Sequence, residues 1–216
     1  MTMVTNPPAI PIWVKVAYSA FVTLVVPYYW VTYSPWNFLY FCDIALLVTA
    51  VAIWIESPLL ISMQAIAITV LQLIWVADFL CRLIAGVHIT GVTAYMLDSS
   101  IPLFLRALSL YHGWLPFFLL WSLSRLGYDR RALGAQSVVA IMVLLISYLL
   151  APAPPPSAVH PNWAVNINYV YGLDDKHPQT MMAPGLWLLF ITAVAVAIYL
   201  PTHFVLRRFF KAPSSR

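Results

Sequence analysis

Long runs of apolar residues, separated by short polar turns, constrain this chain more than any other feature of its sequence. Each run is about long enough to cross the ~30 Å hydrocarbon core of a bilayer as a helix. Hydrophobic residues make up 62% of the 216 residues and charged residues only 8%, which leaves too little polar surface for a soluble domain. The sequence predicts an all-α fold, a polytopic transmembrane helical bundle in one domain over residues 1–216. The predicted spans are residues 13–33, 38–55, 59–85, 101–124, 135–151 and 183–205.

Two clusters of basic residues set the predicted orientation of these spans. Cytoplasmic loops of membrane proteins carry an excess of Lys and Arg, so both clusters are expected inside. The loop 152–182 then lies on the extracytoplasmic side, and both termini are cytoplasmic in the inner membrane. We interpret the clusters as a topology signal and expect no nucleic-acid partner. The clusters are Arg125, Arg130 and Arg131, and Arg207, Arg208, Lys211 and Arg216.

The segment 86–97 is too short and too rich in Gly, Thr and Tyr to span comfortably. We expect it to form a short re-entrant or interfacial piece covered by protein or water, which gives six spans in total. A seven-span alternative stays open, in which residues 87–105 cross the membrane and the N-terminus lies outside. In that alternative Cys42 and Asp43 lie at the opposite membrane face from Asp98.

A polar stretch precedes and enters the predicted helix 101–124. Ser99 or Ser100 is expected to cap this helix, with Pro102 tolerated in its first turn. Arg106, Ser109 and His112 follow at three-residue spacing and share one helix face. Asp98 lies just before the helix, within reach of the same face. One interpretation is a structural Asp98–Arg106 ion pair, with His112 hydrogen-bonded to a neighbouring helix.

The predicted span 59–85 carries a polar stripe on one face, formed by Gln72, Trp75, Asp78 and Arg82. Asp78 and Arg82 have the i,i+4 spacing of a helical ion pair. Such a pair is expected either to relay protons, to hold an anionic head group, or to pack two helices through paired charges. With six spans, the polar residues near the outer ends of the helices form one pocket that opens outward under the loop 152–182. These residues are Asp43, Asp78, Arg82, His88, Asp98 and Arg106.

Cys42, followed by Asp43, and His112 form the sharpest chemical hypothesis. A thiol beside an imidazole can act as a nucleophile with a general base. The alternative is that Cys42 only packs within an apolar helix. No closely spaced pair of histidines and no nucleotide-binding motif occurs in the sequence, so we expect no metal and no cofactor.

Five segments resemble a family of uncharacterised bacterial integral membrane proteins. The resemblance covers the chain from about Asn37 to the C-terminal tail. More distantly, the Cys-Asp, His-Gly and Asn-Tyr segments are similar to the YwaF-like membrane proteins, whose human branch is linked to lipid acyl transfer through a cysteine and a histidine. By position, this resemblance implies those roles for Cys42 and His112. The segments are residues 37–46 (NFLYFCDIAL), 95–98 (YMLD), 109–116 (SLYHGWLP), 127–131 (GYDRR) and 166–172 (NINYVYG).

The predicted function is therefore that of a membrane-embedded lipid-modifying enzyme for acyl transfer or hydrolysis, with membrane lipids as partners. Cys42 is the expected nucleophile and His112 the expected base. One alternative is a small transporter or proton-relay protein. Another is an accessory subunit of a larger membrane complex, and a homo-oligomer is also left open. The expected substrate-binding residues are Asp43, Asp78, Arg82, Asp98 and Arg106.

Overall fold

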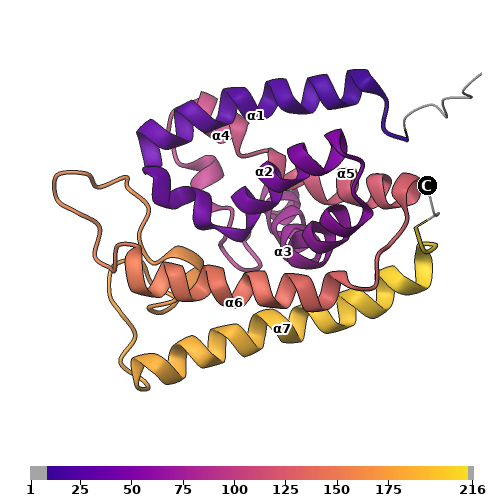
Figure 1. The fold of residues 1–216 in the computed structure, drawn as a ribbon. Coiled ribbons are helices and arrows are strands. Elements are labelled where there is room, and N and C mark those ends of the chain that lie inside the picture. Colours follow the sequence, from indigo (N-terminus) through magenta and orange to yellow (C-terminus); the bar gives the residue numbers. More distant parts are fainter. Residues whose placement is uncertain (1–8, 214–216) are drawn as a thin grey trace, which may run out of the picture.

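The computed structural model describes residues 9–213, so the predicted tail at residues 1–8 and the basic residue Arg216 lie outside the described part. Within it, every regular element is helical and no strand forms. Figure 1 shows α1, α6 and α7 at the periphery of a bundle with α3 near its centre. The α-helices are α1 (Ile12–Tyr33), α2 (Phe41–Trp54), α3 (Pro58–Ala85), α4 (Leu103–Leu108), α5 (Tyr111–Leu126), α6 (Ala132–Leu150) and α7 (Pro184–Phe209). The short 3₁₀ helices are η1 (Pro35–Leu39), η2 (Ala94–Leu97) and η3 (Ile167–Tyr169).

The central helix α3 is the core of the bundle. Every side chain from Ile61 to Thr69 is buried, and α2, α5, α6 and α7 all pack against α3. Small residues in this stretch, such as Ala65 and Ala67, let neighbouring helices approach closely, which is how transmembrane helices usually pack. The helix starts at Ser57, whose hydroxyl accepts a hydrogen bond from the Leu60 N–H, and ends at Gly86 in the left-handed conformation.

Five helical segments are long and apolar enough to cross a membrane, which confirms a multi-pass integral membrane protein. The remaining predicted span, residues 38–55, is shorter than expected. Helix α2 has 14 residues, or about 21 Å of helix, because residues 35–39 form η1 instead of continuing the run. The five segments are Ile12–Tyr33, Pro58–Ala85, Leu103–Leu126, Ala132–Leu150 and Pro184–Phe209.

The predicted start of the helix 101–124 is wrong. Helix α4 begins at Leu103, after Pro102, and no side chain caps it. Ser100 does not cap the helix because its N–H and hydroxyl donate to the Asp98 carboxylate, at 2.8 and 2.7 Å. These bonds form a local turn of the kind that Asp and Ser favour outside helices. The preceding segment, residues 86–102, contains turns and η2 but no helix of spanning length, so the helix that a seven-span arrangement requires is not seen there.

Hydrogen bonds tie the connecting segments together at the two opposite ends of the bundle. At one end, which we call the basic end, the Asp129 N–H donates to Ser62 Oγ at 2.9 Å, and the Tyr128 N–H donates to the Lys211 carbonyl at 2.7 Å. At the other end, which we call the loop end, the long connection 151–183 covers η1. There Asn168 Nδ2 donates to the Leu39 carbonyl at 2.8 Å. Residues 86–102 also lie at the loop end, because they follow the end of α3.

An ion pair closes the basic end. Glu56, in the turn between α2 and α3, accepts hydrogen bonds from Lys15 Nζ and from the N–H groups of Ala9 and Ile10, at 3.0 to 3.1 Å. Burial alone would raise the pKa of Glu56. The hydrogen bonds from Ile10, Lys15 and Ala9 outweigh it and lower the pKa to about 2.

Glu56→Gln is expected to lower the thermal unfolding midpoint by a few degrees at pH 6, because the amide loses the charge and part of the acceptor capacity. The pKa of Glu56 is lower in the folded state, so its contribution to stability is present above about pH 4.5 and is lost as pH falls toward 2. Thermal melts of the detergent-solubilised protein across this range measure the difference. An equal difference between wild type and variant at pH 6 and pH 2.5 would contradict this account.

Candidate functional site

A cavity of about 410 Å³ lies between α3 and α7 near the loop end. Its walls come from the middle of α3, from α7, and from the starts of α2 and α5. Loop residues Asn168, Tyr169 and Leu173 cover it. The lining is mostly aliphatic and aromatic. It contains no Asp, Glu, Lys or Arg among the described residues. Apart from the tyrosines and Trp75, the polar side chains in the lining are those of Cys42, Gln72, His112 and Asn168. Its volume is typical of a small-molecule site.

The cavity reaches the apolar outer surface of the bundle. Leu71 and Ile74 of α3 line it and are 43% and 42% exposed, and Val194 of α7 lines it from the opposite side at 38%. These residues lie in the middle of spanning helices. Their exposed faces, and with them this side of the cavity, are therefore expected to meet lipid.

A break between α4 and α5 orients His112. The Gly113 N–H donates to the Leu110 carbonyl at 2.9 Å, three residues back, and the Ser109 carbonyl accepts the His112 N–H at 3.1 Å in place of its usual partner four residues on. His112 Nδ1 lies 2.8 Å from that carbonyl. The Ser109 hydroxyl donates to the Leu105 carbonyl at 3.2 Å, an interaction that bends helices. The predicted continuous helix is thus interrupted at the residue that holds the imidazole.

This contact settles the tautomer of His112. A carbonyl oxygen only accepts, so Nδ1 carries a proton, and in the neutral imidazole Nε2 then presents its lone pair. No residue in 9–213 donates a hydrogen bond to Nε2. The ring stacks on Trp75, with centroids 5.6 Å apart and planes at 21°, and the Trp75 indole N–H donates to the Tyr95 hydroxyl at 3.2 Å. His112 is an imidazole held in place on the cavity lining, and its neutral form has the free Nε2 lone pair that a general base needs.

Cys42 lies in the first turn of α2 and lines the same cavity. Both cysteines of the described chain, Cys42 and Cys81, are free thiols. Asn168 fixes the start of α2, because its Oδ1 accepts the Phe41 N–H at 3.2 Å while its amide reaches Leu39.

Asp43 lies behind the cavity wall. Its side chain is buried and accepts hydrogen bonds from Asn37 Nδ2 at 2.9 Å and from the Tyr111 hydroxyl at 3.0 Å. Tyr111 directly precedes His112, and their rings lie 4.1 Å apart. Asp43 therefore links the helix that carries Cys42 to the helix that carries His112.

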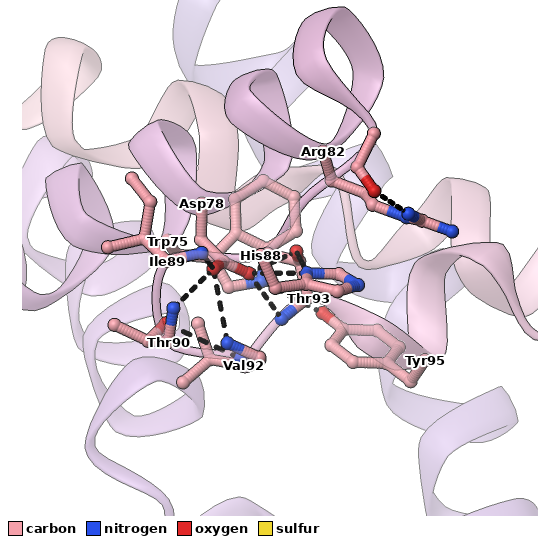
Figure 2. A network of polar contacts seen from close by, with 11 residues as sticks. Trp75, Asp78, Arg82, His88, Ile89, Thr90, Val92, Thr93 and Tyr95 are labelled. Carbon is pink, nitrogen blue, oxygen red and sulfur yellow. Dashed lines mark hydrogen bonds and ion pairs between the residues drawn. The ribbon is translucent and has the colours of Figure 1, made fainter.

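Asp78 is the centre of a separate polar network at the end of α3 (Figure 2). The residue is 0% exposed, and its carboxylate accepts hydrogen bonds from several groups of the segment that folds back after Gly86. The expected Asp78–Arg82 pair does not form, because the loop amides occupy the carboxylate and Arg82 turns away to bond the Gly86 carbonyl. The donors are the N–H groups of Ile89, Thr90, Gly91 and Thr93, the Thr93 hydroxyl and His88 Nδ1.

The expected Asp98–Arg106 ion pair does not form within the described residues either. Arg106 donates to the Met96 carbonyl at 3.1 Å, and Asp98 is exposed. Hydrogen bonds from the Ser100 hydroxyl and N–H lower the pKa of Asp98, with a smaller electrostatic contribution from Arg106. The single polar pocket expected from the sequence is therefore divided. Cys42 and His112 line the cavity, while Asp43, Asp78, Arg82, Asp98 and Arg106 are not among its lining residues.

Four residues of the site were not selected as functional from the sequence. Gln72 and Trp75 stand in the polar stripe of α3, so their spacing could have indicated them. Tyr111 and Asn168 gave weaker signals, because a tyrosine or an asparagine in an aromatic-rich segment usually marks the membrane interface or a turn. Within residues 9–213, no group of three His, Cys, Asp or Glu side chains could hold a metal ion.

Comparison of the chain with protein-family models, curated proteins and solved structures finds no match. The site itself therefore carries the functional argument.

Proposed function

We propose that this protein is a membrane-embedded enzyme that transfers or hydrolyses a lipid acyl group, with Cys42 as nucleophile and His112 as general base. One observation carries the proposal: the Cys42 thiol and the His112 imidazole line the same apolar cavity. The mouth of that cavity faces the lipid side of the bundle. The resemblance to the YwaF-like proteins suggests the same two residues. We also propose that the protein belongs to that group.

The chemistry follows from the form of each group. His112 Nε2 accepts the thiol proton as Cys42 Sγ attacks the carbonyl carbon of a lipid ester. The ester C–O bond breaks, and the leaving alcohol takes the proton back from His112. The acyl group is then held on Cys42 as a thioester. Water or a second alcohol, deprotonated by His112, attacks the thioester and regenerates the thiol. Water gives hydrolysis, and an alcohol gives acyl transfer.

The surroundings of the two groups suit this chemistry. The aliphatic and aromatic walls match acyl chains. The Ser109 carbonyl and the Trp75 ring hold the imidazole, so little reorganisation is needed during proton transfer. The transporter alternative has less support, because the acidic residues that could carry a substrate or proton already accept hydrogen bonds. Asp78 accepts from its loop and Asp98 from Ser100.

We further propose six membrane crossings with both termini in the cytoplasm of a cell with an inner membrane. Arg125, Arg130 and Arg207 lie at the basic end, which the charge rule places inside. The cavity then lies in the outer half of the bilayer beneath the loop 151–183. The short helix α2 makes the second crossing, and η1 adds the length that α2 lacks to span the bilayer.

A lipid-turnover assay in nanodiscs tests the enzyme proposal. Purified protein is expected to release lysophospholipid from a diacylphospholipid bilayer, and mass spectrometry follows the product with time. Cys42→Ala is expected to remove the activity, whereas Cys81→Ala, a matched change at the other free cysteine, retains it. Equal activity in Cys42→Ala and wild type would overturn the assignment of the nucleophile.

A further inference from the structure

Gln72 presents an unpaired carboxamide to the cavity. The residue is 3% exposed, and neither Nε2 nor Oε1 has a hydrogen-bond partner among the described residues. Other buried polar atoms also lack partners, but Gln72 is the only one of their residues that lines the cavity. It stands three residues before Trp75, the ring on which His112 stacks. The carboxamide and the imidazole thus face one space.

A buried amide that forms no hydrogen bond is unfavourable, and most buried polar groups in proteins are paired. Asn37, Asn166 and Asn168 follow this rule, since all three form hydrogen bonds. Among the described residues Oε1 of Gln64 and Oε1 of Gln136 also lack a partner, but Gln72 is the amide in which both polar atoms do, and it lines the cavity where the other two do not. A carboxamide offers N–H donors and a carbonyl acceptor side by side. It therefore recognises a group that contains both an acceptor and a donor.

The lining limits the ligand further. No charged side chain of the described residues lines the cavity, so a charged head group would find no counter-ion there. The part of the lipid that reaches Gln72 is then uncharged. In a glycerolipid, an ester carbonyl next to a free hydroxyl has this character and offers one acceptor and one donor.

We propose that Gln72 binds the ester carbonyl and an adjacent free hydroxyl of a monoacyl lipid, with Nε2 donating to the carbonyl and Oε1 accepting from the hydroxyl. This inference rests on the proposed function for the nature of the ligand, and it adds the monoacyl lipid that a diacyl lipid releases as a further substrate class of the same site. Gln72 is a specificity-determining residue in this arrangement. The carbonyl that it holds is the one presented to Cys42.

A binding experiment in a Cys42→Ala background tests this directly, because no turnover is then expected. The probes are 1-oleoyl-lysophosphatidylcholine and its 2-O-methyl ether, which lacks only the donor. Native mass spectrometry of the detergent-solubilised protein gives both dissociation constants. We expect the free hydroxyl to improve affinity by about tenfold, the effect of one good hydrogen bond. Adding Gln72→Leu should bring the ratio of the two constants close to one.

Gln64→Leu is the matched control. Gln64 is a buried glutamine of the same helix with an unpaired Oε1, but it does not line the cavity, so its variant should keep the tenfold ratio. Gln72→Met provides a second apolar variant of similar length should the leucine disturb folding. The inference would be overturned if the two dissociation constants were already equal with Gln72 in place. It would also be overturned if their ratio were unchanged in both Gln72 variants. Preference for the hydroxyl without any lipid turnover by wild type would overturn the proposed function alone.

Discussion

His112→Gln is expected to lower the rate of lipid acyl turnover by about 10² to 10⁴-fold, the range usually contributed by a positioned general base. Glutamine is uncharged and can still donate a hydrogen bond to the Ser109 carbonyl, but it has no basic nitrogen to accept the Cys42 proton. Lysophospholipid release in nanodiscs measures the effect under the same conditions for each variant.

The control for this experiment is His160→Gln. His160 lies in the exposed part of the loop 151–183, where it stacks on Trp163, and it does not line the cavity. Its variant should turn over lipid at the wild-type rate. If His112→Gln kept more than about a tenth of the wild-type rate, the imidazole could not be the base that this mechanism requires.

Asp78→Ala is expected to cause the largest loss of stability of any single change at the loop end, at least about 3 kcal/mol, the net contribution of one or two hydrogen bonds to a charged group. The carboxylate organises residues 88–93 through four backbone N–H groups. Without it, those groups can be satisfied only if the loop opens to water. Thermal unfolding in detergent measures the change in stability. Limited proteolysis within residues 86–97 reports the opening of the loop.

Asp98→Ala provides a matched comparison. Asp98 also accepts hydrogen bonds from a nearby backbone N–H and a hydroxyl, but it is exposed, so water replaces the lost contacts. We expect a much smaller loss of stability than Asp78→Ala causes. Equal unfolding midpoints for the two variants would show that the Asp78 network does not hold the loop.

The helical membrane architecture could be predicted from the sequence because hydrophobic runs of membrane length have few other folds available. The lack of a long helix over residues 86–97 also followed from the length and composition of this segment. The break in the predicted helix after Leu108 could not be predicted from the sequence. It depends on Ser109 bonding to its own helix and on Tyr29 of α1, whose hydroxyl lies 2.9 Å from Ser109 Oγ. Such a contact is not visible from helical periodicity.

The ion pairs show a second limit of sequence reasoning. The spacing of Asp78 and Arg82 fits a helical pair, but α3 ends three residues after Arg82, and the chain folds back over the acid. Several loop N–H groups then outcompete the single Arg82 guanidinium. Cys42 and His112 were chosen by their chemistry and by the resemblance, and both are among the residues that line one cavity. The unpaired state of Gln72 depends on three-dimensional surroundings alone.

The most direct test of the central claim is to detect the acyl group on Cys42. Protein is mixed with a short-chain diacylphospholipid, quenched in acid within seconds and analysed by intact-protein and peptide mass spectrometry. We predict an added mass equal to the acyl group minus one hydrogen, located on Cys42, removed by neutral hydroxylamine, and absent in His112→Gln. An unmodified Cys42 in protein that is turning over lipid would contradict the account, as would acylation at Cys81 instead.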